Sequence, residues 1–309
     1  MINYERFFKN CILNLEEYIK INNLKSCVIG ISGGIDSTLS ACIASYACKH
    51  TNIPLIGRYI VSDTNKVDET QSALKVGQAF CTDFKEVNIP GETCVLYDLA
   101  KNEGEMSNLQ IGNVKARLRM IYLRHLASLH KGIVLDNDNY TEYQVGFFAV
   151  AGDSPMDYNV GLHYLYKTEV YEFARYLANY YNDCGKSGLQ YVEAITTSMK
   201  LTPTDGNGVS NSDCEQFGLD NYDQVDDVLR TMYEPDLKEK YFVDSDRLIM
   251  YNKAGIGLIS EDTKPYFDSY AKLIHYYNEQ GVDKVMSLHH NTEYKRKSLP
   301  IMPDKKDLI

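Results

Sequence analysis

A glycine-rich turn that carries hydroxyl and carboxylate side chains is the part of the chain best suited to chemistry. The turn reads Ser32-Gly33-Gly34-Ile35-Asp36-Ser37-Thr38 and follows the apolar run Cys27–Ile31. Glycines let backbone N–H groups approach a phosphate closely, and a helix that begins at the turn adds the partial positive charge of its N-terminus. A Walker loop would have a lysine before its hydroxyl residue, and this turn has none. A glycine turn that merely ends a buried strand is the alternative, but the pattern favours a phosphate-binding loop.

Basic residues at helical spacing form a second candidate site, at Gly112-Asn113-Val114-Lys115-Ala116-Arg117-Leu118-Arg119-Met120. On a helix, Lys115 and Arg119 share a face, whereas Arg117 points elsewhere. Arginine suits phosphate groups because its planar guanidinium donates two parallel hydrogen bonds. A solvated basic helix face is the common alternative. The position of this stretch behind the glycine-rich turn favours a role in phosphate binding.

Alternating strands and helices must position these residues. Apolar periodicity predicts strands at 27–31, 55–61, 84–89 and 132–135, and helices at 4–23, 37–49, 67–81 and 110–130. This alternation is typical of an α/β fold in which helices flank a doubly wound parallel sheet. Ligands of such sheets bind beyond the carboxyl ends of the strands, where the Ser32 turn and the segment after Leu135 both lie.

The chain changes character beyond Ala151. The pattern predicts a helix at 166–181, a polar loop at about 200–220 that could act as a mobile lid, and outer helices at 222–233 and 265–279. No linker divides the chain, so we expect a single domain over 1–309. Its core would span about 25–180, and a helical C-terminal part would span 221–309.

Bulk composition excludes several classes of protein. The net charge of −10 argues against non-specific binding to nucleic acid or to an anionic membrane. No apolar stretch approaches the ~20 residues of a membrane span, and no signal peptide is visible at the N-terminus. The eight cysteines form no C-x-x-C pair, which speaks against structural zinc and indicates reduced thiols in a cytoplasmic protein.

These motifs, in this order, resemble those of the ammonia-dependent NAD synthetases, a family of the ATP pyrophosphatase (adenine nucleotide alpha hydrolase-like) superfamily. The glycine-rich turn resembles the superfamily signature, and the 112–120 stretch resembles the family pattern G-N-x-x-A-R-x-R-M. Asp138-Asn139-Tyr140-Thr141-Glu142 resembles the segment whose glutamate joins a magnesium site. Tyr294-Lys295-Arg296-Lys297, with Pro300, resembles the family's tail motif.

The resemblance implies a role for each matching residue. The expected catalytic residues are Asp36, Glu142 and Lys167, and Asp36 and Glu142 are also the expected ligands of Mg²⁺. The expected ATP-binding residues are Gly30, Ser32, Gly33, Gly34, Asp36, Ser37, Arg58, Lys167 and Thr197. The residues expected to bind the pyridine dinucleotide are Arg117, Asn137, Asp153, Asp157 and Lys295.

The implied reaction is the ATP-dependent amidation of nicotinic acid adenine dinucleotide to NAD through an acyl-adenylate, with release of AMP and pyrophosphate. The turn begins only about thirty residues into the chain, which leaves no room for the amidase domain of a glutamine-using form. We therefore expect ammonia as the nitrogen donor. Enzymes of this short type are generally homodimers, so a homodimer is expected as well.

Departures from the family pattern keep two alternatives open. Asp136 and Asn137 stand where the family usually has glycine and then threonine or serine, and Tyr294 replaces the tail histidine. Asp136 places a negative charge beside a site for phosphates, which is expected to weaken ATP binding or to recruit another cation. One alternative is a non-catalytic nucleotide-binding sensor. The other is a different adenylating enzyme, although the acidic charge counts against a tRNA substrate.

Overall fold

The computed structural model describes the chain except for residues 1, 63–64, 90, 202–215, 234–272 and 297–309. Contacts between Cα atoms group the chain into two compact units. The first comprises Met1–Tyr143, Phe148–Ser212 and Ser298–Ile309, and the second comprises Gln144–Phe147 and Asp213–Lys297. The expectation of a single domain over 1–309 stays a prediction.

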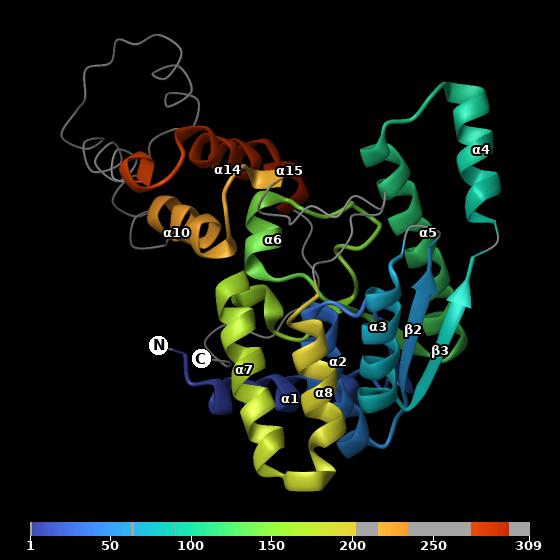
Figure 1. Ribbon diagram of the computed structural model, residues 1–309. Coiled ribbons are helices and arrows are strands. Elements are labelled where there is room, and N and C mark those ends of the chain that lie inside the picture. Colours follow the sequence, from blue (N-terminus) through green and yellow to red (C-terminus); the bar gives the residue numbers. More distant parts are fainter. Residues whose placement is uncertain (1, 63–64, 90, 202–215, 234–272, 297–309) are drawn as a thin grey trace, which may run out of the picture. The chain divides into compact units, whose positions relative to one another are not determined.

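The first unit is built on a five-stranded sheet in which every strand pairs in parallel. The strands are β1 (Ser26–Gly30), β2 (Leu55–Val61), β3 (Asp83–Asn88), β4 (Gly132–Asp136) and β5 (Tyr158–Asn159). Their order is β3-β2-β1-β4-β5, and the neighbouring strands β2 and β3 can be followed in Figure 1. The chain thus winds outward in both directions from β1, which confirms the predicted doubly wound parallel sheet.

Helices cover both faces of this sheet. One face is covered by α1 (Tyr4–Ile21), α2 (Ile35–Thr51), α3 (Val67–Phe80), α7 (Lys167–Asp183) and α8 (Leu189–Ser198), and the other by α5 (Asn108–Leu129). The chain also forms α4 (Glu92–Glu103) and α6 (Tyr140–Val145). Short 3-10 turns lie at Leu162–Tyr164 and Gly185–Ser187.

Alternate residues of the buried strands feed two hydrophobic cores. Cys27 and Ile29 of β1 pack with residues of α1, α2, α3, α7 and α8. Val28, between them, packs with Leu123 and Leu126 of α5 on the opposite face. Because both faces are covered, β1 and β2 are nearly continuous apolar runs, as strands of a parallel sheet usually are.

Besides the short 3-10 turns, helices α4, α6 and α8 and strand β5 are among the elements that were not predicted from the sequence. Helix α4 packs beside α5 (Figure 1), but its apolar residues at 94–97 are consecutive in the sequence, and periodicity alone does not assign so short a run to a helix. Helix α6 has 6 residues and β5 has 2, which is too short for either to show a periodic pattern.

The point where the strand order reverses lies between β1 and β4. There the side-chain amide of Asn137, just after β4, donates a hydrogen bond of 3.2 Å to the carbonyl of Gly30, the last residue of β1. The segments that leave these two strands are therefore tied together at the carboxyl edge of the sheet. Ligands of doubly wound sheets bind at this place.

The second unit contains α10 (Tyr222–Tyr233), α14 (Glu279–Asn291) and α15 (Glu293–Arg296). Helices α10 and α14 pack together and bury Val225, Leu229, Val282 and Val285. The prediction of a helix at 222–233 is confirmed. The predicted loop at 200–220 and helix at 265–279 fall largely outside the described residues. Among the helices of the described ranges, none combines the length and apolarity that a membrane crossing requires.

Candidate active site

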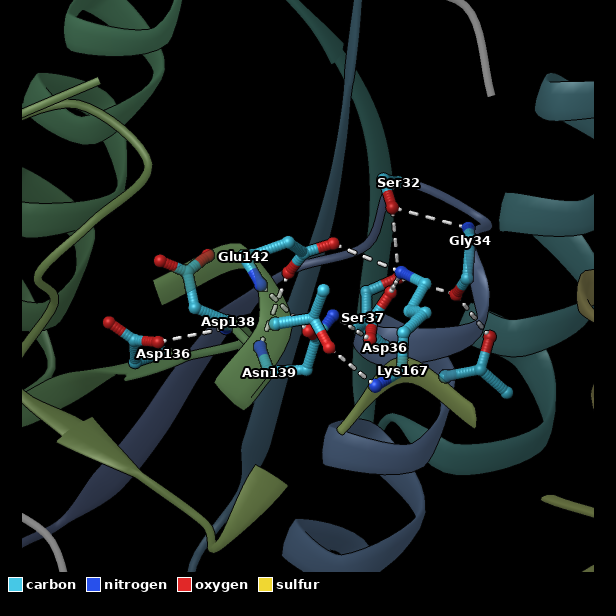
Figure 2. A network of polar contacts seen from close by, with 11 residues as sticks. Ser32, Gly34, Asp36, Ser37, Asp136, Asp138, Asn139, Glu142 and Lys167 are labelled. Atoms are coloured by element: carbon cyan, nitrogen blue, oxygen red, sulfur yellow. Dashed lines mark hydrogen bonds and ion pairs between the residues drawn. The ribbon is translucent and has the colours of Figure 1, made fainter. Parts of the chain in front are cut away.

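The glycine-rich turn folds into a compact loop held by its own hydroxyl groups. The Ser32 hydroxyl oxygen lies 3.0 Å from that of Ser37 and accepts a hydrogen bond of 3.2 Å from the backbone N–H of Gly34 (Figure 2). The hydroxyls of Ser37 and Thr38 donate to the carbonyl of Gly34 at 3.1 and 2.8 Å. Gly34 is the N-cap of α2, so the loop leads directly into a helix N-terminus.

Helix α3 fixes the loop from the side. Gly33 has φ +86°, and a Cβ there would lie 2.8 Å from both the carbonyl oxygen of Glu69 and the backbone nitrogen of Ala73. The hydroxyl of Ser72, which is fully buried, donates a hydrogen bond of 2.7 Å to the carbonyl of Gly33. Glycine is therefore required at this position both by its left-handed backbone and by the close approach of α3.

Three charged side chains from separate parts of the sequence converge beside the loop. The ammonium of Lys167 lies 2.6 Å from Oδ2 of Asp36 and 3.0 Å from Oε1 of Glu142 (Figure 2). Asp36 lies in the first turn of α2, Glu142 in the first turn of α6, and Lys167 is the first residue of α7. The three predicted catalytic residues thus form one cluster.

The N-terminus of α6 is built to hold that cluster. The side-chain oxygen of Asn139 accepts from the backbone N–H of Glu142 at 3.0 Å, while Oε2 of Glu142 accepts from the backbone N–H of Asn139 at 3.2 Å. This reciprocal arrangement is a capping box. The hydroxyl of Thr141 accepts from the backbone N–H of Lys167 at 2.8 Å, which ties the start of α7 to α6.

Asp136 is a buried residue whose carboxylate is held by hydrogen bonds. It is fully buried, and its oxygens accept hydrogen bonds from the backbone N–H groups of Asp138 and Met156, from the amide of Asn159 and from the hydroxyl of Ser154, at 2.8 to 3.4 Å. Burial raises its pKa. Both oxygens of Asp136 are thus engaged by the chain's own donors, and the expectation that this residue recruits another cation stays a prediction.

Unmatched polar atoms gather around the end of β4. Within the described ranges, Oδ1 of Asn137, Oδ2 of Asp138 and Nε of Arg119 are buried without a hydrogen-bond partner. Burial, and then the negative charges of Asp136 and Glu142, raise the pKa of Asp138 well above its ordinary value. Buried polar atoms left without partners are rare, and they often mark a functional site.

The carboxylates of the site could supply some, but not all, of the ligands of a magnesium ion. Among the described residues no group of three or more histidine, cysteine, aspartate or glutamate side chains is arranged to hold a metal ion. Asp36 and Glu142 nevertheless aim one oxygen each at the same ammonium group. Mg²⁺ prefers hard oxygen ligands and is usually held by one or two carboxylates together with substrate phosphates and water. Two converging carboxylates are therefore sufficient as the protein ligands of such an ion.

Two residues predicted to bind ATP contact residues outside the cluster of Asp36, Glu142 and Lys167. Arg58 lies in the middle of β2, and its guanidinium forms an ion pair of 3.0 Å with Asp83 at the start of β3. That guanidinium lowers the pKa of Asp83. Thr197 lies on α8, where its hydroxyl is 3.5 Å from the ammonium of Lys75. The ATP contacts of Arg58 and Thr197 stay predictions.

The residues predicted to bind the dinucleotide are dispersed. Arg117 is exposed and donates to the carbonyl of Val150 at 3.2 Å, while Lys115 of the same helix is buried, as the predicted helical facing requires. Asp153 accepts from the backbone N–H of Ala149 at 2.6 Å.

Asn137, Asp157 and Lys295 of this set hold parts of the framework, Asn137 through its hydrogen bond to Gly30. The carboxylate of Asp157 forms an ion pair of 2.6 Å with Arg124 of α5 and accepts a hydrogen bond of 2.9 Å from the backbone N–H of Val134. In the second unit, the ammonium of Lys295 donates to the carbonyl of Gly146 at 2.6 Å. The dinucleotide contacts of the whole set stay predictions.

Sequence reasoning missed the residues that brace the site: Ser72, Asn139 and Thr141. A readable signal existed for one of them, because asparagine three residues before glutamate is a helix-start pattern. The partners of Ser72 and Thr141 are distant along the chain or on another helix, so no local pattern announces them.

Comparison with known proteins identifies this arrangement. A sequence profile described as NAD synthase matches residues 7–249. The chain belongs to the NAD synthase family. Curated relatives of this family include the NH(3)-dependent NAD(+) synthetase of Finegoldia magna, which is 30% identical over 244 residues, covering 79% of this chain and 90% of the relative. The protein of the same name from Thermoplasma volcanium is 29% identical over 210 residues, or 68% of this chain and 78% of the relative.

Solved structures support the fold of this NAD synthase family member. The NMN synthetase from Francisella tularensis matches with a TM-score of 0.67 at 22% identity, covering 98% of this chain and 100% of that one. The NH3-dependent NAD synthetase from Campylobacter jejuni matches with a TM-score of 0.61 at 17% identity and the same coverage. At these identities the likeness establishes the architecture alone.

Proposed function

We infer that this protein catalyses the ATP-dependent amidation of nicotinic acid adenine dinucleotide, the deamido form of NAD, with ammonia as the nitrogen donor. The products are NAD, AMP and pyrophosphate. The observation that carries this inference is the convergence of Asp36, Glu142 and Lys167 beside the Ser32–Ser37 loop at the switch point of a NAD synthase fold. The sensor alternative is not favoured, because the residues that chemistry needs are present and assembled.

The first step makes a poor electrophile reactive. A carboxylate resists attack by ammonia because its leaving group would be oxide. In the proposed step, a carboxylate oxygen of the dinucleotide attacks the α-phosphorus of ATP, the bond to the bridging oxygen breaks, and pyrophosphate leaves. The Gly33–Gly34 backbone and the N-terminus of α2 are the proposed site for pyrophosphate, because a helix N-terminus favours negative charge.

Lys167 is the proposed mobile charge of this step. Its ammonium is almost buried, with 7% of the side chain exposed, and it lies between two carboxylates. Preorganised positive charge stabilises the charge that develops on transferring phosphates. We propose that Asp36 and Glu142 would hold Mg²⁺, which would supply positive charge beside the phosphates. Lys167, whose ammonium lies at the same two carboxylates, is the proposed contact to a phosphate.

The second step forms the amide. Ammonia adds to the carbonyl carbon of the acyl-adenylate, the bond to the AMP oxygen breaks, and a proton is lost from nitrogen. AMP leaves with one oxygen of the original carboxylate. None of these bonds needs a covalent nucleophile from the protein, so no cysteine has a role in the chemistry.

A homodimer is proposed on the surface of α4 and α5. None of the residues of α4 is buried, and Tyr97 is 65% exposed. On α5, Leu109, Ile121 and Leu129 are between 65% and 73% exposed. Large apolar side chains exposed on the surface of helices can mark an interface. Sedimentation of Ile121→Asp beside the wild type tests this proposal, because loss of a dimer is expected only if this surface forms it.

We also propose a cytoplasmic location. Cys11, Cys27 and Cys42 are free, buried thiols. Thiols of this kind are usual in reducing compartments.

The direct test incubates the purified protein with ATP, Mg²⁺, deamido-NAD and ammonium, and follows NAD and AMP by chromatography. Ammonia-dependent NAD together with equimolar AMP supports the proposed function. AMP without NAD would indicate a different acceptor. Neither product, in a protein that still binds ATP, would contradict the enzyme and favour the sensor. Asp36→Asn is the matched inactive variant.

A further inference from the structure

We propose that Asn139 is a positioning residue that sets the spacing and orientation of the Asp36 and Glu142 carboxylates. The proposal rests on the proposed function, because it concerns how this enzyme prepares its site for Mg²⁺ and ATP. No sequence pattern assigns Asn139 such a role.

Asn139 bonds to both carboxylates at once. Its side-chain amide donates to Oδ1 of Asp36 at 2.9 Å across 103 residues of sequence, and its backbone N–H donates to Oε2 of Glu142 at 3.2 Å (Figure 2). Its side-chain oxygen accepts from the backbone N–H of Glu142 at 3.0 Å. The residue is fully buried. A buried side chain with these bonds has little freedom to move, so it fixes the position of α6 relative to the start of α2.

Asn139 and Lys167 use different oxygens of the same two carboxylates. Lys167 contacts Oδ2 of Asp36 and Oε1 of Glu142. Asn139 contacts Oδ1 of Asp36 and Oε2 of Glu142. The oxygens that face the ammonium are thus the pair that a cation can take, while the other pair is held by hydrogen bonds.

The contacts of Lys167 and those of Asn139 therefore respond differently to a cation that binds between the carboxylates. A cation between the carboxylates replaces the ammonium of Lys167, because both need the same oxygens. The bonds of Asn139 do not compete with it and persist. Without the amide of Asn139, the Asp36 carboxylate could rotate once Lys167 has left. Groups that orient metal ligands in this way typically contribute 10- to 100-fold to metal affinity.

Serine at position 139 separates the two jobs of the residue. A serine is a good N-cap and can still accept from the backbone N–H of Glu142, but its short side chain cannot reach Asp36. Asn139→Ser therefore removes one hydrogen bond and keeps the helix start. Asn139→Thr repeats the test with a second capping residue. Asn3→Ser is the matched control, because Asn3 caps α1 by accepting from Arg6 at 3.0 Å and is not among the site residues.

The experiment measures binding of Mg²⁺ in the presence of ATP, without the dinucleotide, by titration calorimetry. Steady-state kinetics and thermal unfolding of the same proteins accompany it. We expect Asn139→Ser and Asn139→Thr to weaken Mg²⁺ binding by about 10-fold or more and to lower kcat at limiting Mg²⁺. The KM for deamido-NAD should change by less than about 2-fold, since uniform substrate binding is untouched. Asn3→Ser should match the wild type in both.

A double-mutant cycle confirms the route of the effect. In the Asp36→Asn background, Asn139→Ser should weaken Mg²⁺ binding no further, because the carboxylate that it orients is gone. Capping variants that fold and bind Mg²⁺ as tightly as the wild type would overturn the proposal while leaving the proposed function intact. A wild-type protein that binds neither Mg²⁺ nor ATP would overturn both.

Discussion

Gly33→Ala tests whether the phosphate loop is held against α3 in the way described. Alanine in the left-handed region costs about 1 to 2 kcal/mol, and Gly33 has φ +86°. The added Cβ would also lie 2.8 Å from two backbone atoms of α3, which cannot rotate away as a side chain can. Overpacking of this kind typically costs about 1 to 3 kcal/mol. Together these effects predict a loss of about 2 to 5 kcal/mol in the free energy of unfolding.

Gly34→Ala is the matched control one residue further on. Gly34 has φ −72° and ψ 164°, which any residue adopts, and its Cβ would lie 3.3 Å from the hydroxyl of Ser32, a group that can turn. Its stability should stay within about 1 kcal/mol of the wild type. Urea unfolding at 25 °C measures both variants.

Turnover provides the second reading of the same perturbation. A displacement of about 1 Å in a substrate-holding loop can cost on the order of 100-fold in rate, so Gly33→Ala should lose about that factor in kcat/KM for ATP. Equal stability and equal ATP kinetics of Gly33→Ala and the wild type would refute the reasoning, because the close approach of α3 would then place no demand on the loop.

Two further predictions concern charge. Burial lowers the pKa of His163 to about 4 from the usual 6.5, so the unfolded chain binds the extra proton between these values and stability falls as pH drops from about 6.5 to 4. His163→Phe should remove up to about 3 kcal/mol of that fall, which urea unfolding at several pH values measures; an unchanged slope would contradict it. Lys167→Met leaves Asp36 and Glu142 facing each other, so it should abolish turnover and lower the free energy of unfolding by about 2 kcal/mol, less than for a fully buried pair because 17% and 16% of these side chains are exposed. Thermal unfolding of Lys167→Met should show that Mg²⁺ restores part of this stability. A midpoint that changes neither with the substitution nor with Mg²⁺ would contradict the described cluster.

Local sequence patterns predicted most strands of the sheet and much of the site. Strand β2 was predicted with its observed bounds, because a buried parallel strand is a continuous apolar run between turns. The glycine-rich loop could be recognised because its chemistry depends on residues that are adjacent in sequence. Asp36, Glu142 and Lys167 were brought together by family resemblance, since nothing local links residues so far apart.

What escaped prediction depends on long-range packing. The apolar residues of helix α4 at 94–97 are consecutive in the sequence, and periodicity alone does not assign so short a run to a helix. The pairing of Arg58 with Asp83 follows from the register of β2 on β3, which a single sequence does not reveal. Asp136 was interpreted as a charge beside the phosphates, but it is buried and its oxygens accept hydrogen bonds from the 154–159 segment.

An oxygen-label transfer tests the central claim most directly. Deamido-NAD carrying ¹⁸O in both carboxylate oxygens is converted with unlabelled ATP, Mg²⁺ and ammonium, and the AMP is analysed by mass spectrometry. The proposed acyl-adenylate predicts that each AMP gains one ¹⁸O atom while the other stays in the amide of NAD, and that Asp36→Asn yields neither. Unlabelled AMP formed together with NAD would contradict attack of the carboxylate on the α-phosphate.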